Sequence, residues 1–478
     1  MNQITRRRFL AGTGVVLGGA GLAACGSSGG GSSKNSLSWW DQFQPLAAME
    51  NAIFKAFERK HPKLKVEYTT YDPNKQGQAI QLAHQGNQMP DVFSLAGIQY
   101  PPSRLAHDGW FSPLQVDKSV LARLPENSVL DGMCVFDGKT YSFPTFSPRQ
   151  YSTLTWFNSE VFDQAGLDPD RDLSTWDDFR RSARQIKSKI SGGYGWIAPI
   201  QFPDRMATHV DELAAAGGGT GAIDPRTGEY AYSSDPYVNA IEFLLSMKSD
   251  DSLFPASASV DARTARVRWA AGKIGLFFDG PWNVGVVKQS FAEFLPKVGV
   301  TSIPTAEAGD PVMYSGPPAG VFWISASSKH QQEASELLAQ MTTDTYYEHL
   351  ADSMDQPPIK LDAVARSHAH PTYKKSIELF AQEVLLAPSP IVRNTAVSDV
   401  QAAMEQIKPD VGDIVQGAFS GQISDVRKAL QTYNDKITQE REKAVKQVSA
   451  EGKKVSLDDW KFANWDPKHD YTSYMYPS

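Results

Sequence analysis

The sequence predicts an α/β protein whose opening segment forms a mostly parallel sheet, and two observations lead to this fold class. Between residues 36 and 96, the spacing of apolar residues switches repeatedly between a period of two and a period near 3.6. That alternation of strands and helices is typical of parallel strands joined by crossover helices that cover both faces of a sheet. The composition, with 41% hydrophobic and 21% charged residues, is typical of a soluble globular protein.

The first 24 residues are predicted to be a targeting segment that takes no part in the fold. Residues 5–10 (TRRRFL) match a twin-arginine export signal, and the Gly- and Ala-rich apolar run that follows is short for a membrane span. Residues 22–25 (LAAC) fit a lipobox, in which Cys25 is lipidated and becomes the first residue of the mature protein. The alternative is an ordinary secretory signal with an incidental cysteine. Removal of residues 1–24 takes away three arginines and no acid, so the net charge changes from −7 to −10 (−7 − 3).

Residues 25–35 are predicted to form the lipidated Cys25 and a flexible tether. The sequence GSSGGGSSKN has the low-complexity composition of a chain that does not pack. Acyl chains on Cys25 would hold the protein at a membrane surface when more than one is attached. The globular body is then expected to begin near residue 36.

Five elements follow in order and form the predicted strand–helix–strand–helix–strand unit. The predicted helix 46–57 cannot continue past Pro62, because the residue before a proline disfavours the helical conformation. The fourth element ends at Gly86. The predicted strands cover 36–41, 64–68 and 91–96, and the predicted helices cover 46–57 and 74–85.

The stretch 261–283 joins a helix, a strand and a turn with few intervening residues. Asp261 is suited to cap a short helix that stops at Gly272, and the strand that follows is apolar at alternate positions 274, 276 and 278. Pro281 suits the first position of a further helix. Asp279, Trp282 and Asn283 therefore lie at the end of a strand, where ligands bind in open α/β sheets. The alternative is that Trp282 is a core residue.

Three later segments have clear patterns. Asp137-Gly138 predicts a tight hairpin turn between short strands. Apolar positions from 424 to about 448 predict a long helix. The extension 451–478 is too aromatic for a disordered tail, and we expect it to wrap on the body; a docking arm for a partner is the alternative.

Several other functions find little support in the sequence. Cys134 is the only cysteine left once Cys25 is lipidated, so no internal disulfide is expected, and a buried thiol is favoured. The glycine run 217–221 lacks the Lys-Ser/Thr of a phosphate-binding loop and is predicted to be a flexible loop. His368 and His370 lack further ligands at a metal-binding spacing. A mildly acidic chain without a dense Lys/Arg stripe argues against nucleic acid. We expect neither a cofactor nor a metal, and no catalytic residue.

Motifs along most of the body resemble one family. Ala270-Ala271-Gly272-Lys273 followed by Gly280-Pro281-Trp282 resembles a signature of bacterial extracellular solute-binding proteins of the carbohydrate class, the family of maltose-binding protein. In that family the Trp of this motif stacks on a sugar ring. Further segments are similar to the same family: Phe57-Glu58 through Pro62 to Val66, Met89-Pro90-Asp91-Val92, 109–114, 137–144, 154–158, 175–179 and 315–325.

The resemblance implies the two-lobed periplasmic-binding-protein fold, type II-like, with lobes that are discontinuous in sequence. Three chain crossings between the lobes are expected near 145–150, 298–304 and 351–357. One lobe would comprise 36–145 plus 305–350, and the other 146–304 plus 351–450. The extension 451–478 has no counterpart in the family pattern.

The resemblance also implies a function: a lipid-anchored substrate-binding protein of an ABC importer, on the extracytoplasmic face of the cell membrane. Its partners would be a carbohydrate and the permease subunits, and we expect a monomer. Sugars bind aromatic platforms beside carboxylates, amides and arginines. The expected ligand-binding residues are Trp39, Trp40, Asp41, Gln99, Arg149, Tyr151, Asp279, Trp282 and Asn283.

Two alternatives of other classes stay open. A binding protein for glycerol phosphate, a polyamine or a peptide would share the fold, and the charge of the ligand would distinguish it. An exported carbohydrate-active enzyme would share aromatic clefts, and turnover of a glycan would distinguish it.

Overall fold

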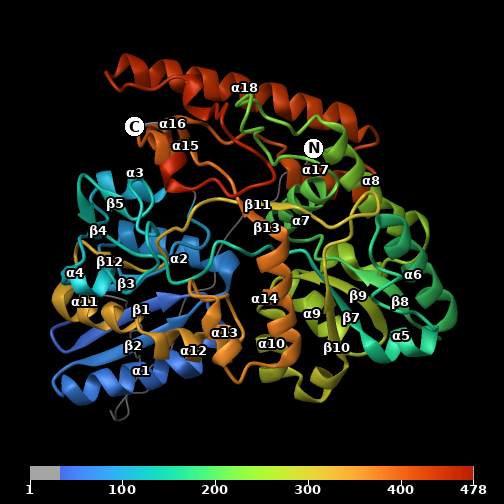
Figure 1. Ribbon diagram of the computed structural model, residues 1–478, viewed down its shortest axis with the longest axis horizontal. Helices are drawn as coiled ribbons and strands as arrows, with labels where there is room; N and C mark the ends of the chain where they lie inside the picture. Colours follow the sequence, from blue (N-terminus) through green and yellow to red (C-terminus); the bar gives the residue numbers. More distant parts are fainter. Residues whose placement is uncertain (1–32, 99, 477–478) are drawn as a thin grey trace, which may run out of the picture.

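The computed structural model describes residues 33–98 and 100–476, so the targeting segment and Cys25 lie outside the described residues. The described chain forms two separate sheets, each covered by helices, with β11, β13 and α14 between them (Figure 1). This is a mixed α/β architecture of two lobes, as the sequence predicts. Within the described ranges, no helix combines the length and apolar character that crossing a membrane requires.

The first sheet has the strand order β2-β1-β3-β12-β4. β1, β2 and β3 are parallel, whereas β12 is antiparallel to both of its neighbours, β3 and β4. The predicted strand–helix–strand unit of residues 36–96 is therefore confirmed. The strands are β1 (Ser36–Asp41), β2 (Lys65–Thr70), β3 (Val92–Phe93), β4 (Phe111–Ser112) and β12 (Trp323–Ser325), and the helices of this lobe are η1 (Gln44–Leu46), α1 (Ala47–Lys60), α2 (Pro73–Gln85), α3 (Pro102–His107), α4 (Lys118–Leu121), α11 (Gln331–Gln340), α12 (Asp344–Ser353) and α13 (Asp362–Arg366).

The second sheet has the strand order β10-β7-β9-β8. β8 and β9 are parallel, and β7 is antiparallel to β9 and β10. Every residue of β9 is buried, as expected for a strand covered on both faces. The strands are β7 (Leu154–Asn158), β8 (Tyr194–Ile197), β9 (Ile274–Asp279) and β10 (Val298–Thr301), and the helices of this lobe are α5 (Ser159–Ala165), α6 (Trp176–Lys189), α7 (Pro203–Ala216), α8 (Asp235–Ser249), η2 (Pro255–Ser259), α9 (Ala262–Ala270), α10 (Asn283–Ser290), η3 (Ala292–Lys297), α14 (Pro371–Glu383) and α17 (Val411–Ser420).

Two short ladders lie where the chain passes between the sheets. In the first, the amide of Ser147 donates to Pro357 O at 2.8 Å, and that of Ile359 donates to Thr145 O at 2.9 Å. In the second, β11 (Met313–Ser315) pairs in parallel with β13 (Val384–Leu386). The stretch expected to cross near 298–304 begins as β10 inside the second sheet, and the chain reaches the first sheet only at β12.

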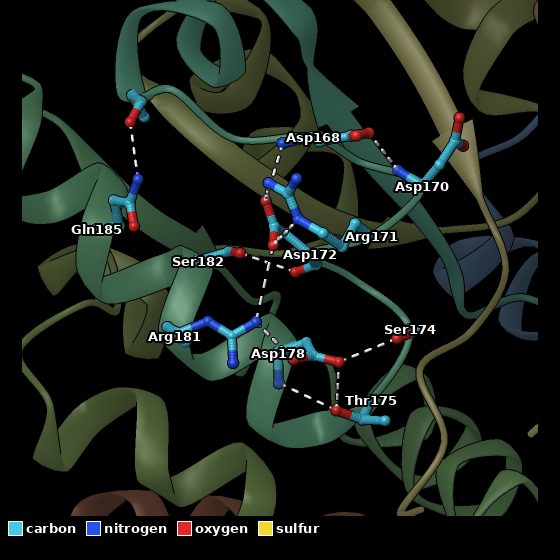
Figure 2. A network of polar contacts seen from close by, with 11 residues as sticks. Asp168, Asp170, Arg171, Asp172, Ser174, Thr175, Asp178, Arg181, Ser182 and Gln185 are labelled. Carbon is cyan, nitrogen blue, oxygen red and sulfur yellow. Dashed lines mark hydrogen bonds and ion pairs between the residues drawn. The ribbon is translucent and has the colours of Figure 1, made fainter. Parts of the chain in front are cut away.

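A polar network fixes the start of α6 (Figure 2). The hydroxyl of Thr175 accepts from the amide of Asp178 at 3.1 Å and donates to the carboxylate of Asp178 at 2.7 Å, which caps the helix. Arg181 reaches the same carboxylate at 2.6 Å and Asp172 at 3.7 Å. The carboxylate of Asp178 thus takes part in the cap of α6.

The structure confirms the short hairpin and the buried thiol. β5 (Val135–Phe136) and β6 (Lys139–Thr140) pair antiparallel around Asp137 and Gly138, whose φ angles of 50° and 70° suit a two-residue turn. Cys134 is buried, and burial raises the pKa of its thiol to about 12.

The C-terminal part packs on the body, which confirms that the extension is not a free tail. The long predicted helix is α18 (Val426–Ala450), which begins one residue after the capping Asp425. Beyond it Trp460, Phe462, Trp465 and Tyr471 are buried. The remaining elements here are α15 (Pro390–Arg393), α16 (Val397–Ala403), η4 (Leu457–Trp460) and η5 (Ser473–Met475).

Candidate ligand-binding site

A cavity of about 260 Å³ lies between the two lobes. Its first wall follows the ends of three parallel strands. Residues 42–45 come after β1, Asp72 and Pro73 come after β2, and Ala96 comes after β3. Because the carboxyl ends of parallel strands meet at one edge of a sheet, this wall lies where open α/β sheets bind ligands.

The second wall comes from the other lobe and is built in the same way. Phe202 and Arg205 lie at the start of α7, which follows β8, and Trp282 follows β9. The start of α9 contributes Asp261, Ala262, Arg263 and Arg266, and residues 355 and 356 come from the segment that leads to the first ladder. The cavity thus combines aromatic rings with charged and amide side chains: Gln42, Phe43, Gln44, Asp72, Phe202, Arg205, Asp261, Arg263, Arg266, Trp282, Asp355 and Gln356.

Trp282 lies half-buried at the cavity, and its ring folds back over Gly280. A Cβ atom at position 280 would lie 2.2 Å from the ring, so the close approach requires glycine. The indole Nε1 donates to Asp279 Oδ1 at 2.8 Å. The guanidinium of Arg205 lies 5.0 Å from the ring centroid, within the range of a cation–π contact.

Asp279 and Asn283 support this arrangement from behind the cavity. Asp279 is buried and accepts from Arg266 Nε at 2.9 Å and from the amide of Gly280 at 2.9 Å. Arg266 Nη2 forms an ion pair with the same carboxylate. Arg266 Nε also donates to Asn283 Oδ1 at 3.1 Å. Neither Asp279 nor Asn283 lines the cavity; they hold Trp282 and Arg266 in place.

Two polar groups at the cavity lack hydrogen-bond partners among the described residues. The side chain of Arg205 makes no hydrogen bond to another residue within 33–98 and 100–476, and burial lowers the pKa of its guanidinium. Asp355 is 3% exposed, and its Oδ2 has no hydrogen-bond partner in the described part of the chain. Burial raises the pKa of Asp355 to about 7, and the charge of Asp41 adds to the rise. Groups of this kind are costly unless a ligand or water completes their hydrogen bonds.

Two contacts cross the cleft beside the cavity. Arg263 Nη2 of α9 lies 3.6 Å from Asp72 Oδ2 of the first lobe. Gln289 Nε2 of α10 donates to Pro45 O at 3.2 Å. The two lobes therefore touch on the cavity side in this arrangement.

The structure places five further predicted site residues away from the cavity: Trp39, Trp40, Asp41, Arg149 and Tyr151. Trp39 is fully buried between Phe54 and Phe322, with ring centroids 5.2 and 4.8 Å away. Its Nε1 donates to Asp41 at 2.9 Å, and Asp41 is itself buried, so burial raises the pKa of that carboxyl. These two residues are core residues here, because strand alternation turns both of them inward.

Trp40, Tyr151 and Arg149 also contact residues that do not line the cavity. Trp40 packs against Tyr71 with a centroid distance of 5.0 Å. Tyr151 is buried and donates to Glu383 at 2.5 Å. Arg149 forms an ion pair with Asp470 of the C-terminal extension. Gln99 lies outside the described residues.

The sequence reasoning missed most of the second wall. Arg263 and Arg266 lie inside the stretch 261–283, but nothing in their spacing marked them as cavity residues. Arg205 and Phe202 follow a strand and Pro203 begins the helix, which is the signal that could have found them. Asp355 precedes Gln356-Pro357-Pro358, the expected third crossing. Across the described ranges, no three His, Cys, Asp or Glu side chains come together as a metal site would need.

Comparisons with known proteins agree with the two-lobed fold. The chain is 26% identical over 325 residues to an ABC transporter extracellular-binding protein of Pyrococcus horikoshii, covering 64% of this chain and 67% of the relative. It is 23% identical over 360 residues to the multiple sugar-binding protein of Streptococcus mutans, covering 73% of this chain and 81% of the relative. A solute-binding protein of an ABC transporter from Thermotoga lettingae, crystallised with α-D-tagatose, superposes with a TM-score of 0.65 at 20% identity. That match covers 85% of this chain and all of the other, and it supports the fold.

The family model of the bacterial extracellular solute-binding proteins matches residues 40–348, which is more than half of the chain. The matched range contains the second sheet, most of the first sheet and the residues of both cavity walls up to Val286. The family is one of binding proteins, and its description places them outside the cell. The chain belongs to the bacterial extracellular solute-binding protein family.

Proposed function

We propose that this protein is the substrate-binding component of an ABC importer and that it binds a sugar or an oligosaccharide in the interlobe cavity. One observation carries the proposal: the half-buried ring of Trp282 lies beside two polar groups without hydrogen-bond partners among the described residues, Arg205 and Asp355 Oδ2. A sugar ring offers an apolar C–H face to an aromatic side chain and hydroxyl groups to both of the others. The ligands in the names of the relatives, several sugars and tagatose, have the same chemistry.

The proposed mechanism is closure of the two lobes about the ladders between them. The ligand contacts both walls at once, so it stabilises the closed arrangement by its differential affinity for the two states. The permease then recognises the closed form. We propose lobe boundaries of 36–145 plus 305–350 and 146–304 plus 351–450, with α13 of the last segment packed on α12 of the first lobe.

The proposed contact residues differ from those the sequence alone suggested. Trp282 stays as the stacking platform, with Arg205 and Asp355 as its polar partners and Phe202 as a second aromatic side chain. Asp279 and Asn283 act through Trp282 and Arg266.

A thermal-shift screen of the mature protein tests the ligand class. Neutral sugars, polyols, their phosphates, a polyamine and a peptide are compared, since a ligand that binds only the folded state raises the melting temperature. We expect a rise with one or more neutral sugars, lost in Trp282→Ala. A rise with only a phosphate, polyamine or peptide would support the binding protein for a non-sugar solute. Turnover of the sugar by purified protein would support the carbohydrate-active enzyme instead.

We also propose that Cys25 is lipidated after twin-arginine export and anchors the protein to the extracytoplasmic membrane face as a monomer. Cys25→Ala should move the protein from the membrane fraction to the soluble fraction with an unchanged melting temperature, because the tether contributes nothing to either core. Ser27→Ala, two residues beyond the cysteine, is the matched control and should stay in the membrane fraction. A Cys25→Ala protein that still partitions with membranes contradicts the anchor.

A further inference from the structure

The C-terminal extension runs across the second lobe, the ladders and the first lobe in that order. Its start is held by the second lobe, where the amide of Phe462 donates to Pro225 O at 2.7 Å and Arg226 lies 5.8 Å from the ring of Trp465. Phe462 and Trp465 are both buried. This end is therefore anchored by burial of large aromatic side chains.

The middle of the extension is bound to the segments that join the lobes. Tyr314 of β11 donates to Pro467 O at 3.1 Å. Asp470 forms an ion pair with Arg149 and accepts from the amide of Leu386 in β13 at 2.9 Å. The amide of Tyr471 donates to Leu386 O at 2.7 Å. The middle of the extension therefore contacts Arg149, which follows the first ladder, and both strands of the second ladder.

Near its far end the extension touches the first lobe through the side chain of Tyr474, and the chain then turns back, since the amide of Ser389 donates to the hydroxyl of Tyr476 at 2.8 Å. Asn127 Nδ2 donates to the hydroxyl of Tyr474 at 3.0 Å, and that hydroxyl lies 3.4 Å from Glu126 Oε1. Tyr474 is 78% exposed, so little apolar burial supports this contact. Between it and the ladders lies a second cavity of about 410 Å³, lined by parts of the first lobe, the connecting segments and the extension. Elsewhere the first lobe lies close to Ile391 of α15 at Gly132, so Tyr474 is its contact with the extension and not with the whole C-terminal part.

We propose that residues 451–476 form a strap that restrains movement of the lobes, with Tyr474 as its releasable contact. The strap rests on the two-lobed fold and does not depend on which ligand the cavity takes. Its strong end is buried on the second lobe, and its weak end holds Asn127 of the first lobe. Because the contacts Asp72–Arg263 and Gln289–Pro45 close the cavity side in the same arrangement, loss of the weak end should reduce the population of that arrangement.

Distance measurements between the lobes test the proposal without any ligand. Spin labels on Lys55→Cys in α1 and Lys189→Cys in α6, both exposed, report the separation by pulsed electron resonance in the full mature chain carrying Cys25→Ala. Cys134 is buried and stays unlabelled. Tyr474→Phe removes the hydroxyl that makes both contacts, and Asp470→Asn weakens the pair with Arg149. Lys468→Ala removes an exposed side chain of the same strap and serves as the control.

We expect Tyr474→Phe and Asp470→Asn to lower the ratio of the described to the opened arrangement by about 2- to 10-fold, the factor expected for one lost hydrogen bond. Lys468→Ala should leave the distance distribution unchanged. The melting temperatures separate this effect from loss of the fold. If Tyr474→Phe gives the same distribution as Lys468→Ala, the strap proposal is overturned, whatever Asp470→Asn does.

Discussion

Trp282 and Trp39 differ in what surrounds them, and this predicts opposite effects of truncation. Trp282→Ala should cost about 1–3 kcal/mol of ligand affinity, as for aromatic hot spots, and little free energy of unfolding in the unliganded protein. Trp39→Ala should lower the free energy of unfolding by about 3–5 kcal/mol, because its fully buried ring fills the first core. Titration calorimetry with the sugar found in the screen and urea denaturation measure the two quantities. If Trp282→Ala is destabilised yet binds the sugar normally, Trp282 is only a core residue.

Asp355 makes stability depend on pH in a defined direction. Its pKa is about 7 in the folded protein against 3.8 in the unfolded chain, so the folded state holds more protons between these values. Stability is therefore lost as the pH rises from about 4 through 7. Asp355→Asn cannot ionise and should flatten this loss, as read from urea denaturation at pH 5 and pH 8. Burial also raises the pKa of Asp211 to about 6 and that of Glu212 to about 7, so part of the pH dependence of the unfolding free energy remains in the variant. An unchanged slope in Asp355→Asn argues against an ionisable Asp355.

At the scale of single residues, the sequence reached Trp282 but not its neighbours. The turn at Gly280 and Pro281 is a local signal, and it placed Trp282 at the end of β9, where it lines the cavity. Asp355 is brought there by packing between the lobes, which no local pattern reports, whereas Pro203 at the start of α7 is a local signal for Arg205. Strand alternation likewise shows that Trp39 and Trp40 face opposite ways, but not which face the helices cover.

At the scale of elements, the start of α9 connects stability to the cavity. Asp261 accepts from the amide of Thr264 at 2.7 Å and caps the helix that carries Arg263 and Arg266. Asp261→Ala should cost about 0.5–2 kcal/mol of unfolding free energy and also weaken ligand affinity, because the first turn loosens. Asp425→Ala removes the equivalent cap of α18, with the same bond at 2.9 Å, and should cost stability without affinity. Equal affinity of the two variants would mean that the first turn of α9 has no part in binding.

Most elements were predictable because their boundaries are local. The cap at Asp261, the stop at Gly272 and the hairpin at Gly138 all appear as expected. Pro281 was misplaced: the helix begins at Asn283, and Pro281 lies in the preceding turn. α8 was not identified, because its interior is apolar on more than one face and gives a weak period, and α7 was missed although its apolar residues follow a helical period. The return of β12 to the first lobe was implied by the family resemblance alone, and its partners β3 and β4 were not predicted, because they depend on long-range packing.

At the scale of the molecule, the cavity exists only because distant segments come together. Its first wall lies at the ends of strands in the region 36–96, and its second wall lies at the starts of the helices that begin at 203, 262 and 283. Asp355 comes from the segment that leads to the first ladder. The closure and the strap that we propose would both act on the two ladders between the lobes. The binding site and the hinge are therefore parts of one arrangement, and distant segments of the chain must be present for either to form.

The order of the first sheet predicts that residues 36–145 cannot fold alone. β12 lies between β3 and β4, so its absence leaves β4 without its neighbour in the sheet. The core also loses Leu337 and Leu338 of α11, which pack with Leu37 and Trp39. We expect the isolated fragment to lack a cooperative urea transition monitored by tryptophan fluorescence. The matched control joins 305–350 to 36–145 through a flexible linker, which restores β12 and α11 and should restore cooperativity. A cooperative transition in 36–145 alone would contradict the discontinuous lobe.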